Sequence, residues 1–392
     1  MNGERAFELM HRDGVDAIVA TSTENVYYVS NYWSIGKSLG CDVEVYTILP
    51  IKGSPVLVAP FTEADLVIEN RVWIPEIRLY GDSKVTMGEK DGPSEETEAL
   101  IALCKKAKRG EDGVTTLLTT LEEKGLTDRN LALDMSGLNP TIYEKIKTKL
   151  PNAKILDGAS LLREIRFVKN DGELERIRTA TAITEKSMED ALEIARDEIT
   201  ELDLAGMYGY SVAYDGGRVT QNLIGFGERS AYPNPLPSLL EAKKRDLVRL
   251  TLGCTWDHYH SNVSRTAVIG RPLAKAKRVW ESVIAAQDAA LDTIEPGAKA
   301  GEVYSAALKE LGESEIKAVT HAIGHGIGTE CNELPIVYKG GEMELLEGMV
   351  INIDIPLLEL GWGGVQLEDT ALVTSDGYEL LTKTDRALYL LQ

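Results

Sequence analysis

His321-Ala-Ile-Gly-His325-Gly-Ile-Gly328 and, some forty residues later, Gly363-Gly-Val-Gln-Leu-Glu368-Asp-Thr370 are the stretches of this chain that decide its fold. The first places two histidines among glycines, whose missing side chain permits close backbone packing near His325. The second supplies carboxylates. Imidazole and carboxylate oxygen together are ligands of Mn, Co, Fe and Zn ions, so the two stretches predict a metal-binding region. We do not interpret the glycines as a phosphate-binding loop.

The composition is that of a soluble globular protein long enough for two domains. Of the 392 residues, 43% are hydrophobic and 27% are charged, which is a normal balance for a folded chain. The formal net charge of −20 argues against binding to nucleic acid or to an anionic membrane surface, because both need basic patches. The chain has neither a membrane-length apolar run nor an apolar signal core near its first residue, which predicts a cytoplasmic protein. The four cysteines show no paired spacing, which indicates reduced thiols instead of a disulfide framework. They are Cys41, Cys104, Cys254 and Cys331.

The first part of the chain alternates short apolar runs with helical spacing, which is typical of a layered α/β domain. The apolar runs are bounded by turn residues and predict strands at 16–20, 44–49, 55–59 and 130–134. Helical spacing is present at 94–108 and 139–149. We therefore predict a first domain over residues 1–160.

The second part of the chain, residues 161–392, is predicted to form another domain. It begins with a long amphipathic helix at about 170–197, for which Asp171 is the expected N-cap. From about residue 217 strands dominate, with helices near 275–293 and 300–311.

Five motifs follow one another over nearly the whole chain. They are Val15-Asp-Ala-Ile, Glu24-Asn-Val-Tyr-Tyr-Val-Ser-Asn-Tyr, Arg163-Glu-Ile-Arg-Phe-Val-Lys-Asn170 with Glu173, Gly348-Met-Val-Ile-Asn-Ile-Asp354 and Gln366-Leu-Glu368-Asp-Thr. In this order they resemble the family of methionine aminopeptidase, prolidase, aminopeptidase P and creatinase, and within it the prolidase and creatinase branch. The resemblance implies an α/β (α+β) protein in which a creatinase/prolidase-type N-terminal α/β domain precedes a C-terminal domain with the "pita-bread" fold.

The resemblance also implies a dinuclear metallopeptidase site. In active family members two Asp, one His and two Glu hold two divalent ions, which bind a bridging hydroxide and polarise the scissile carbonyl. His325 and Glu368 match two of these ligands, and Asp354 stands where a glutamate is expected. His321 and Glu333 match further positions of the family's catalytic site.

Four positions of that site hold neutral polar residues in this chain. The two aspartate positions read Thr251 and Asn262, and two accessory histidine positions read Asn234 and Asn332. Two of the carboxylates that offset the charge of two divalent ions are therefore missing. The prediction is no metal, or one weakly bound Mn, Co, Zn or Fe ion on the remnant ligands His325, Asp354 and Glu368.

Arg249 lies two residues before Thr251, so on a strand both side chains lie on one face. Because guanidinium pairs well with carboxylates, one hypothesis is that Arg249 takes part of the metal's place and neutralises Asp354 or Glu368. The alternative is that Arg249 bends out to solvent.

Two further groups have alternative interpretations. His258 and His260 lie two residues apart and form either a relocated ligand pair or, as is more common, exposed loop histidines. Cys254 and Cys331 lie near site positions in the sequence. They form a thiolate site with His325 or, as is more common, are buried structural cysteines.

These observations favour a diverged Xaa-Pro dipeptidase or aminopeptidase P homologue whose conventional prolidase activity is impaired or absent. One alternative is an active Xaa-Pro peptidase, or a small C–N hydrolase, that uses one metal ion or none. Another is a non-catalytic pseudo-peptidase that binds a peptide, an amino-acid-like ligand or a protein, with Asn234, Asn332 and Arg249 among its contacts. The resemblance implies a homodimer.

Overall fold

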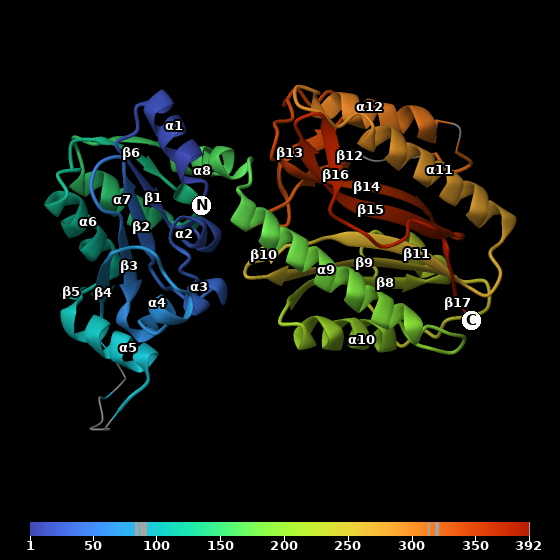
Figure 1. The fold of residues 1–392 in the computed structure, drawn as a ribbon, viewed down its shortest axis with the longest axis horizontal. Coiled ribbons are helices and arrows are strands. Elements are labelled where there is room, and N and C mark those ends of the chain that lie inside the picture. Colours follow the sequence, from blue (N-terminus) through green and yellow to red (C-terminus); the bar gives the residue numbers. More distant parts are fainter. Residues whose placement is uncertain (83–85, 87–91, 313, 318–320, 392) are drawn as a thin grey trace. The chain divides into compact units, whose positions relative to one another are not determined.

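The computed structural model describes the whole chain except residues 83–85, 87–91, 313, 318–320 and 392 (Figure 1). The chain forms two compact units, Met1–Arg166 and Phe167–Gln392. The boundary predicted after residue 160 would cut helix α8 (Gly158–Arg166), whereas the two units divide after Arg166, where this helix ends. The apolar side chains of this helix pack into a core of the first unit, so the whole helix belongs there: Leu161, Leu162 and Ile165.

The first unit is built on a sheet that has seven strands in the described part of the chain. Their order is β5-β4-β3-β2-β1-β6-β7, and the sheet is mixed because β1 runs antiparallel to β2 and parallel to β6. The strands expected at 16–20, 44–49, 55–59 and 130–134 are confirmed as β1, β2, β3 and β6. The bounds are β1 (Ala17–Ala20), β2 (Tyr46–Pro50), β3 (Val56–Pro60), β4 (Glu76–Tyr80), β5 (Lys108–Gly110), β6 (Asn130–Leu133) and β7 (Lys154–Asp157).

Helices cover both faces of this sheet. In β1, Ile18 and Ala20 pack with side chains of α1, α2 and α8, whereas Ala17 and Val19 pack with those of α6 and α7. A strand that is buried on both faces is a continuous apolar run, which is why the sequence reads that way. The helices are α1 (Gly3–Asp13), α2 (Thr23–Ser30), α3 (Ile35–Ser38), α4 (Leu66–Glu69), α5 (Glu95–Lys106), α6 (Gly113–Glu123) and α7 (Pro140–Lys149).

The second unit is built on one large sheet whose main path, β10-β9-β11-β15-β14-β12-β13, is antiparallel. Strands β8 and β16 add antiparallel to β9 and β15, and β17 adds parallel to β11. Helices α9 (Asp171–Glu193), α10 (Glu201–Tyr214), α11 (Ala274–Leu291) and α12 (Ala300–Leu311) pack against it. The strands are β8 (Arg218–Phe226), β9 (Leu247–Trp256), β10 (Tyr259–His260), β11 (Val263–Ile269), β12 (Ala322–Gly326), β13 (Glu333–Tyr338), β14 (Val350–Glu359), β15 (Gly363–Thr374), β16 (Gly377–Leu380) and β17 (Tyr389–Leu391).

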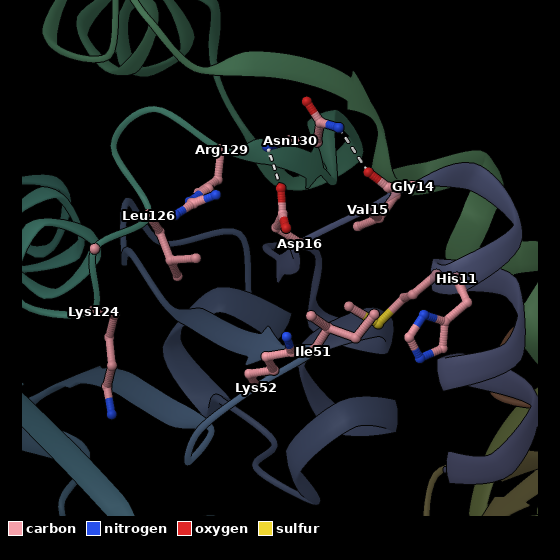
Figure 2. A pocket seen from close by; sticks show the side chains of 12 residues that line it. His11, Gly14, Val15, Asp16, Ile51, Lys52, Lys124, Leu126, Arg129 and Asn130 are labelled. Carbon is pink, nitrogen blue, oxygen red and sulfur yellow. Dashed lines mark hydrogen bonds between the residues drawn. The ribbon is translucent and has the colours of Figure 1, made fainter.

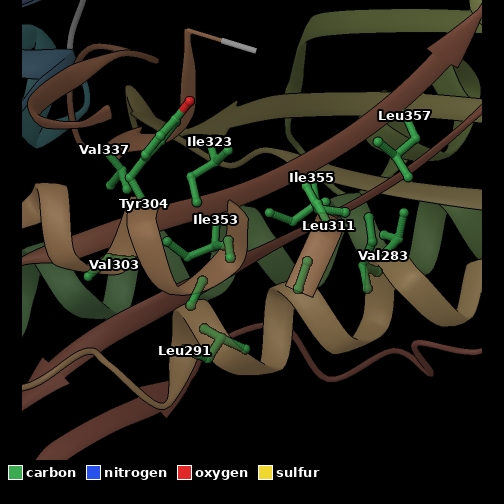
Figure 3. Close-up of a cluster of buried hydrophobic side chains, with 14 of the residues drawn as sticks. Val283, Leu291, Val303, Tyr304, Leu311, Ile323, Val337, Ile353, Ile355 and Leu357 are labelled. Carbon is green, nitrogen blue, oxygen red and sulfur yellow. The ribbon is translucent and has the colours of Figure 1, made fainter. Parts of the chain in front are cut away.

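Alternation along the strands gives this sheet one apolar and one polar face. On β14, Ile351, Ile353 and Ile355 belong to the core formed with α11 and α12, and Figure 3 shows Ile353 and Ile355 among the side chains of these helices. Successive residues of a strand point to opposite faces, so Asn352 and Asp354 lie on the other face. That polar face holds the candidate site.

Helix α9 begins one residue earlier than expected. Its N-cap is Asn170, whose side chain accepts from the backbone N–H of Glu173 while the Glu173 side chain accepts from the N–H of Asn170. Asp171, the expected N-cap, is the first residue of the helix. Asn is as good a cap as Asp, and the reciprocal bond to Glu173 selects it. No helix in the described part of the chain is long and apolar enough to cross a membrane.

Candidate active site

One row of side chains crosses four strands on the polar face of the second sheet. The pairing sets Thr251 (β9) opposite Ser264 (β11), Ser264 opposite Glu368 (β15), and Glu368 opposite Asp354 (β14). Residues directly opposite in antiparallel strands present their side chains on one face, with Cβ atoms about 4.5–5.5 Å apart. The register therefore brings two predicted metal ligands, Asp354 and Glu368, into one row with the substituted ligand position Thr251.

His325 joins this row from strand β12. It pairs with Asn352, and its Nε2 lies 3.9 Å from Oε1 of Glu368. Its Nδ1 lies 3.0 Å from the carbonyl oxygen of Gly326. Because a carbonyl only accepts, Nδ1 is the donor, and Nε2 of the neutral ring presents a lone pair. Burial lowers the pKa of His325, which favours that neutral ring.

Arg249 is buried, with 2% of its surface exposed, so the expectation that it bends out to solvent is wrong. Its Nε donates to the carbonyl oxygen of Ser230 at 2.6 Å. The two terminal nitrogens of its guanidinium donate to the carbonyl oxygen of Tyr232 and to Oε1 of Gln366. The side chain is thus fixed by three acceptors.

Gln366 stands between Arg249 and the acids. Its Nε2 donates to Oδ1 of Asp354 at 2.8 Å, and its Oε1 accepts from Arg249 and, at 3.0 Å, from the hydroxyl of Thr251. Among the residues that the structure describes, no hydrogen bond or ion pair joins Arg249 to Asp354 or Glu368. The hypothesis of direct neutralisation is therefore wrong. The guanidinium contacts Asp354 only through the amide of Gln366.

Glu368 is buried and well supplied with donors. Its Oε2 accepts from the hydroxyl of Ser264 at 2.8 Å, and its Oε1 accepts from Nδ2 of Asn352 at 3.0 Å. The same Asn352 amide also donates to the backbone carbonyl of Asn262 at 3.3 Å, so it links the backbone at Asn262 to Glu368. Oδ1 of Asn262 is buried and accepts no hydrogen bond from the described residues. A buried acceptor without a donor is destabilising.

Burial raises the pKa of both acids. The pKa of Asp354 rises to about 8, with the negative charge of Glu368 as the second cause, and the pKa of Glu368 rises to about 7. The hydrogen bond from Gln366 and the charge of Arg249 offset only part of the effect on Asp354. Burial likewise lowers the pKa of Arg249 to about 10. The two carboxylates therefore lack a strong positive partner.

The side chains of this face do not fit a dinuclear metal centre. The hydroxyl of Thr251 is occupied, since it donates to Gln366 and accepts from Ser264 at 3.1 Å. Asn262 offers a neutral oxygen, and a neutral donor does not offset the charge of a second divalent ion. Within the described ranges, no group of three or more His, Cys, Asp and Glu side chains is arranged to hold a metal ion.

The remaining predicted site residues are not part of this row. Glu333 is buried in an ion pair with Lys169, in which Oε2 and Nζ lie 3.0 Å apart and the side chains are 3% and 2% exposed. His321 is exposed in the bend before β12. Asn234 and Asn332 are exposed as well, in loops that follow the short 3-10 helix η3 (Gly227–Ala231) and β12.

The alternative ligand groups lie in buried or half-buried positions. His258 and His260 are half-buried, so the interpretation as exposed loop histidines is wrong. Burial lowers the pKa of each to about 4. Cys254 is buried and its sulfur accepts from the hydroxyl of Thr184 at 3.2 Å. Cys331 is half-buried. In the described part of the chain neither thiol belongs to a potential metal-binding group.

The sequence interpretation missed three residues that organise the site: Ser264, Asn352 and Gln366. A signal for two of them was present. Gln366 and Asn352 each lie two residues before a predicted ligand, so strand alternation puts them on the ligand's face. Nothing local in the sequence marks Ser264, because its role depends on the pairing of β11 with both β9 and β15.

A cavity of about 460 Å³ lies elsewhere, in the first unit (Figure 2). None of the predicted site residues lines it. Its wall includes the basic side chains of His11, Lys52 and Arg129, and Figure 2 shows Asp16 accepting a hydrogen bond from the backbone of Asn130. This cavity is therefore distinct from the candidate site.

Comparison with known proteins agrees with the fold. Residues 175–375 match metallopeptidase family M24, and residues 4–168 match the creatinase/prolidase N-terminal domain. An Xaa-Pro dipeptidase of Pyrococcus horikoshii is 28% identical over 390 residues, which cover 98% of this chain and 97% of the relative. An Xaa-Pro dipeptidase of Lactobacillus helveticus is 25% identical over 391 residues, covering 97% and 98%.

The crystal structure of the prolidase from Pyrococcus horikoshii superposes on this chain with a TM-score of 0.79 at 28% identity, and 99% of each chain is covered. The predicted fold class and family are thereby confirmed. Because the match to the peptidase family spans just over half of its residues, this chain belongs to metallopeptidase family M24, with the prolidase-like pita-bread domain preceded by a creatinase-type N-terminal domain.

Proposed function

We propose that this protein is a diverged relative of the Xaa-Pro dipeptidases that does not hydrolyse Xaa-Pro peptides by dinuclear metal chemistry. One observation carries the proposal. At the position of a family aspartate, the hydroxyl of Thr251 is bonded to Gln366 and Ser264, in a network that also engages Asp354 and Glu368. The side-chain oxygens that would bind two metal ions in a dinuclear site are thus engaged in hydrogen bonds with other protein groups.

The chemical consequence follows from what two ions supply. In a dinuclear site they generate the nucleophile and polarise the carbonyl. The residues of this face supply neither function by themselves. His325 is a neutral acceptor, and Asp354 and Glu368 have pKa values near neutrality, so they exchange protons but do not activate water as a metal-bound hydroxide does.

A binding role fits this face better. It combines two acids, one imidazole and several amide and hydroxyl groups, which suits a small polar ligand such as a peptide or an amino acid. We propose that the protein is a homodimer, as its resemblance to the family implies, and that it acts in the cytoplasm.

The test is metal retention combined with peptide hydrolysis. The purified protein is stripped with a chelator and dialysed against Mn²⁺ or Co²⁺, and its metal content and its activity on Xaa-Pro dipeptides are measured. We expect the wild type to retain well under one equivalent and to show no metal-dependent hydrolysis. The double variant Thr251→Asp/Asn262→Asp, which returns two carboxylates, should retain more metal. Asn152→Asp, on an exposed turn, is the matched control and should behave as the wild type.

The alternatives predict other outcomes. Stoichiometric metal that is lost in His325→Ala, together with metal-dependent hydrolysis, contradicts the proposal and points to a mononuclear peptidase. The 3.9 Å separation of His325 Nε2 and Glu368 Oε1 is the observation that favours that second candidate. Hydrolysis without metal would point instead to a small C–N hydrolase.

A further inference from the structure

The cavity of about 460 Å³ in the first unit lies at the ends of three neighbouring strands (Figure 2). Its lining includes Asp16 just before β1, Ile51 just after β2 and Asn130 at the start of β6. Because β2 runs antiparallel to β1 and β6 runs parallel to it, these three points meet at one end of the sheet. Small-molecule sites measure about 300–1,000 Å³, so the cavity is large enough for a ligand.

Apolar and charged side chains both line this cavity. The apolar part includes the buried side chains of Met10, Val15 and Leu126. The charged part consists of one carboxylate, three cationic side chains and one histidine, in a chain whose net charge is −20. An apolar lining with a few polar groups that fix the orientation of a molecule is the usual composition of a ligand site. These charged and basic residues are Asp16, Lys52, Lys124, Arg129 and His11.

Two of the basic side chains have a role within the fold. Lys124 is the C-cap of α6, and its ammonium donates to Oε1 of Glu76. His11 lies in the last turn of α1. Basic groups at these positions offset the negative ends of the helix dipoles. Lys52 has no such role: it follows β2, it is exposed, and no hydrogen bond or ion pair engages its ammonium within the described ranges.

Arg129 and Asp16 also keep atoms that the protein leaves available. Nε of Arg129 lies 3.5 Å from Oδ1 of Asp128, in an ion pair whose side chains are 58% and 68% exposed, so water screens the pair and it contributes little. Oδ2 of Asp16 accepts from the backbone N–H of Asn130 at 2.9 Å. In the part of the chain that the structure describes, Oδ1 of Asp16 accepts no hydrogen bond. The cavity thus offers two cations and one strong acceptor to a ligand.

We propose that this cavity binds a small phosphate ester of about the size of a nucleoside monophosphate. A phosphate dianion matches the two cations Lys52 and Arg129, and the planar fork of a guanidinium donates two parallel hydrogen bonds to phosphate oxygens. Oδ1 of Asp16 accepts from a hydroxyl group of the ligand. The apolar side chains of the lining pack against the ligand's body. The site belongs to the first unit, so it is independent of any chemistry on the polar face of the second sheet.

The experiment is calorimetric titration of the full chain, in metal-free buffer of low ionic strength, with four probes. Adenosine 5′-monophosphate and uridine 5′-monophosphate carry a phosphate dianion, hydroxyl groups and a body. Adenosine lacks the phosphate, and inorganic phosphate lacks the body. We expect at least one nucleotide to bind with one site per chain, and adenosine and inorganic phosphate to bind at least about tenfold more weakly, because each keeps only part of the contacts.

Variants locate the binding in the cavity. Lys52→Met and Arg129→Met each remove one cation from an exposed position and should weaken nucleotide binding by about threefold to tenfold. Lys105→Met removes the same charge from an exposed position on α5 outside the cavity, so it is the matched control and should leave the affinity unchanged. Asp16→Asn should weaken nucleotide binding but not the binding of inorganic phosphate, because it removes an acceptor for a hydroxyl group and a charge that repels phosphate.

Three results would overturn the inference. The first is that neither nucleotide binds up to millimolar concentration. The second is that inorganic phosphate binds as tightly as the nucleotides, which would show general attraction of anions. The third is that Lys52→Met and Arg129→Met, with circular dichroism spectra like that of the wild type, lose no more affinity than Lys105→Met.

Discussion

Replacement of Arg249 by methionine tests whether its guanidinium holds the polar face together. The variant keeps an unbranched chain of four heavy atoms, which reaches as far as the Nε position, but removes the donors to Ser230, Tyr232 and Gln366. Ser230 is fully buried, so its carbonyl loses a donor that water does not replace, whereas Tyr232 is 44% exposed. Gln366 keeps the hydroxyl of Thr251 as a donor.

The magnitude follows from this asymmetry. One uncompensated buried carbonyl costs about 1–3 kcal/mol. Removing a buried charge returns part of that loss, because burial already disfavours the charged guanidinium, as its lowered pKa of about 10 shows. We therefore expect the free energy of unfolding of the second unit to fall by about 1–2 kcal/mol, less than the full cost of the unpaired carbonyl.

The assay is urea unfolding followed by tryptophan fluorescence in a background that carries Trp33→Phe and Trp73→Phe. The remaining tryptophans, Trp280 among them, all belong to the second unit, so the signal reports that unit. The control is Arg178→Met, which breaks a half-exposed ion pair with Glu379 and should cost less than about 1 kcal/mol. An equal effect of the two substitutions, or a more stable Arg249→Met, would refute the reasoning.

Two further predictions concern buried charges. The folded pKa values of Asp354 and Glu368, about 8 and about 7, exceed their ordinary values of 3.8 and 4.5. Between about pH 4 and pH 8 the unfolded chain therefore binds fewer protons than the folded chain. The urea midpoint of the second unit should fall as the pH rises through that window. A urea midpoint that rises with pH would contradict this prediction, as would a dependence of the midpoint on pH that is unchanged in Glu368→Gln. Lys169→Met leaves Glu333 buried without its ion-pair partner and should cost about 3–5 kcal/mol. Lys169→Met/Glu333→Gln should recover much of the loss, and a double variant no more stable than the single one would argue against the pair.

The pattern of the fold could be predicted from the sequence because its signals are local. Apolar runs bounded by turn residues predicted the inner strands of the first unit, and their continuous apolarity matches burial on both faces. Alternation in Asn352-Ile-Asp354 and Gln366-Leu-Glu368 is likewise a local property, and it fixes which residues share a face. The start of α9 was misplaced by one residue because Asn170 and Asp171 are equally good caps.

Some residues of the candidate site could be predicted from the sequence, but its hydrogen bonds could not. Local sequence shows that carboxylates and an imidazole remain, and that Thr251 and Asn262 are neutral. The fold was needed to show that Arg249 donates to Gln366 instead of an acid, and that Oδ1 of Asn262 has no donor among the described residues. Strand alternation is set within a few residues, whereas a hydrogen-bond partner depends on the register between strands that are far apart in the chain and on which acceptors lie within reach of a buried side chain.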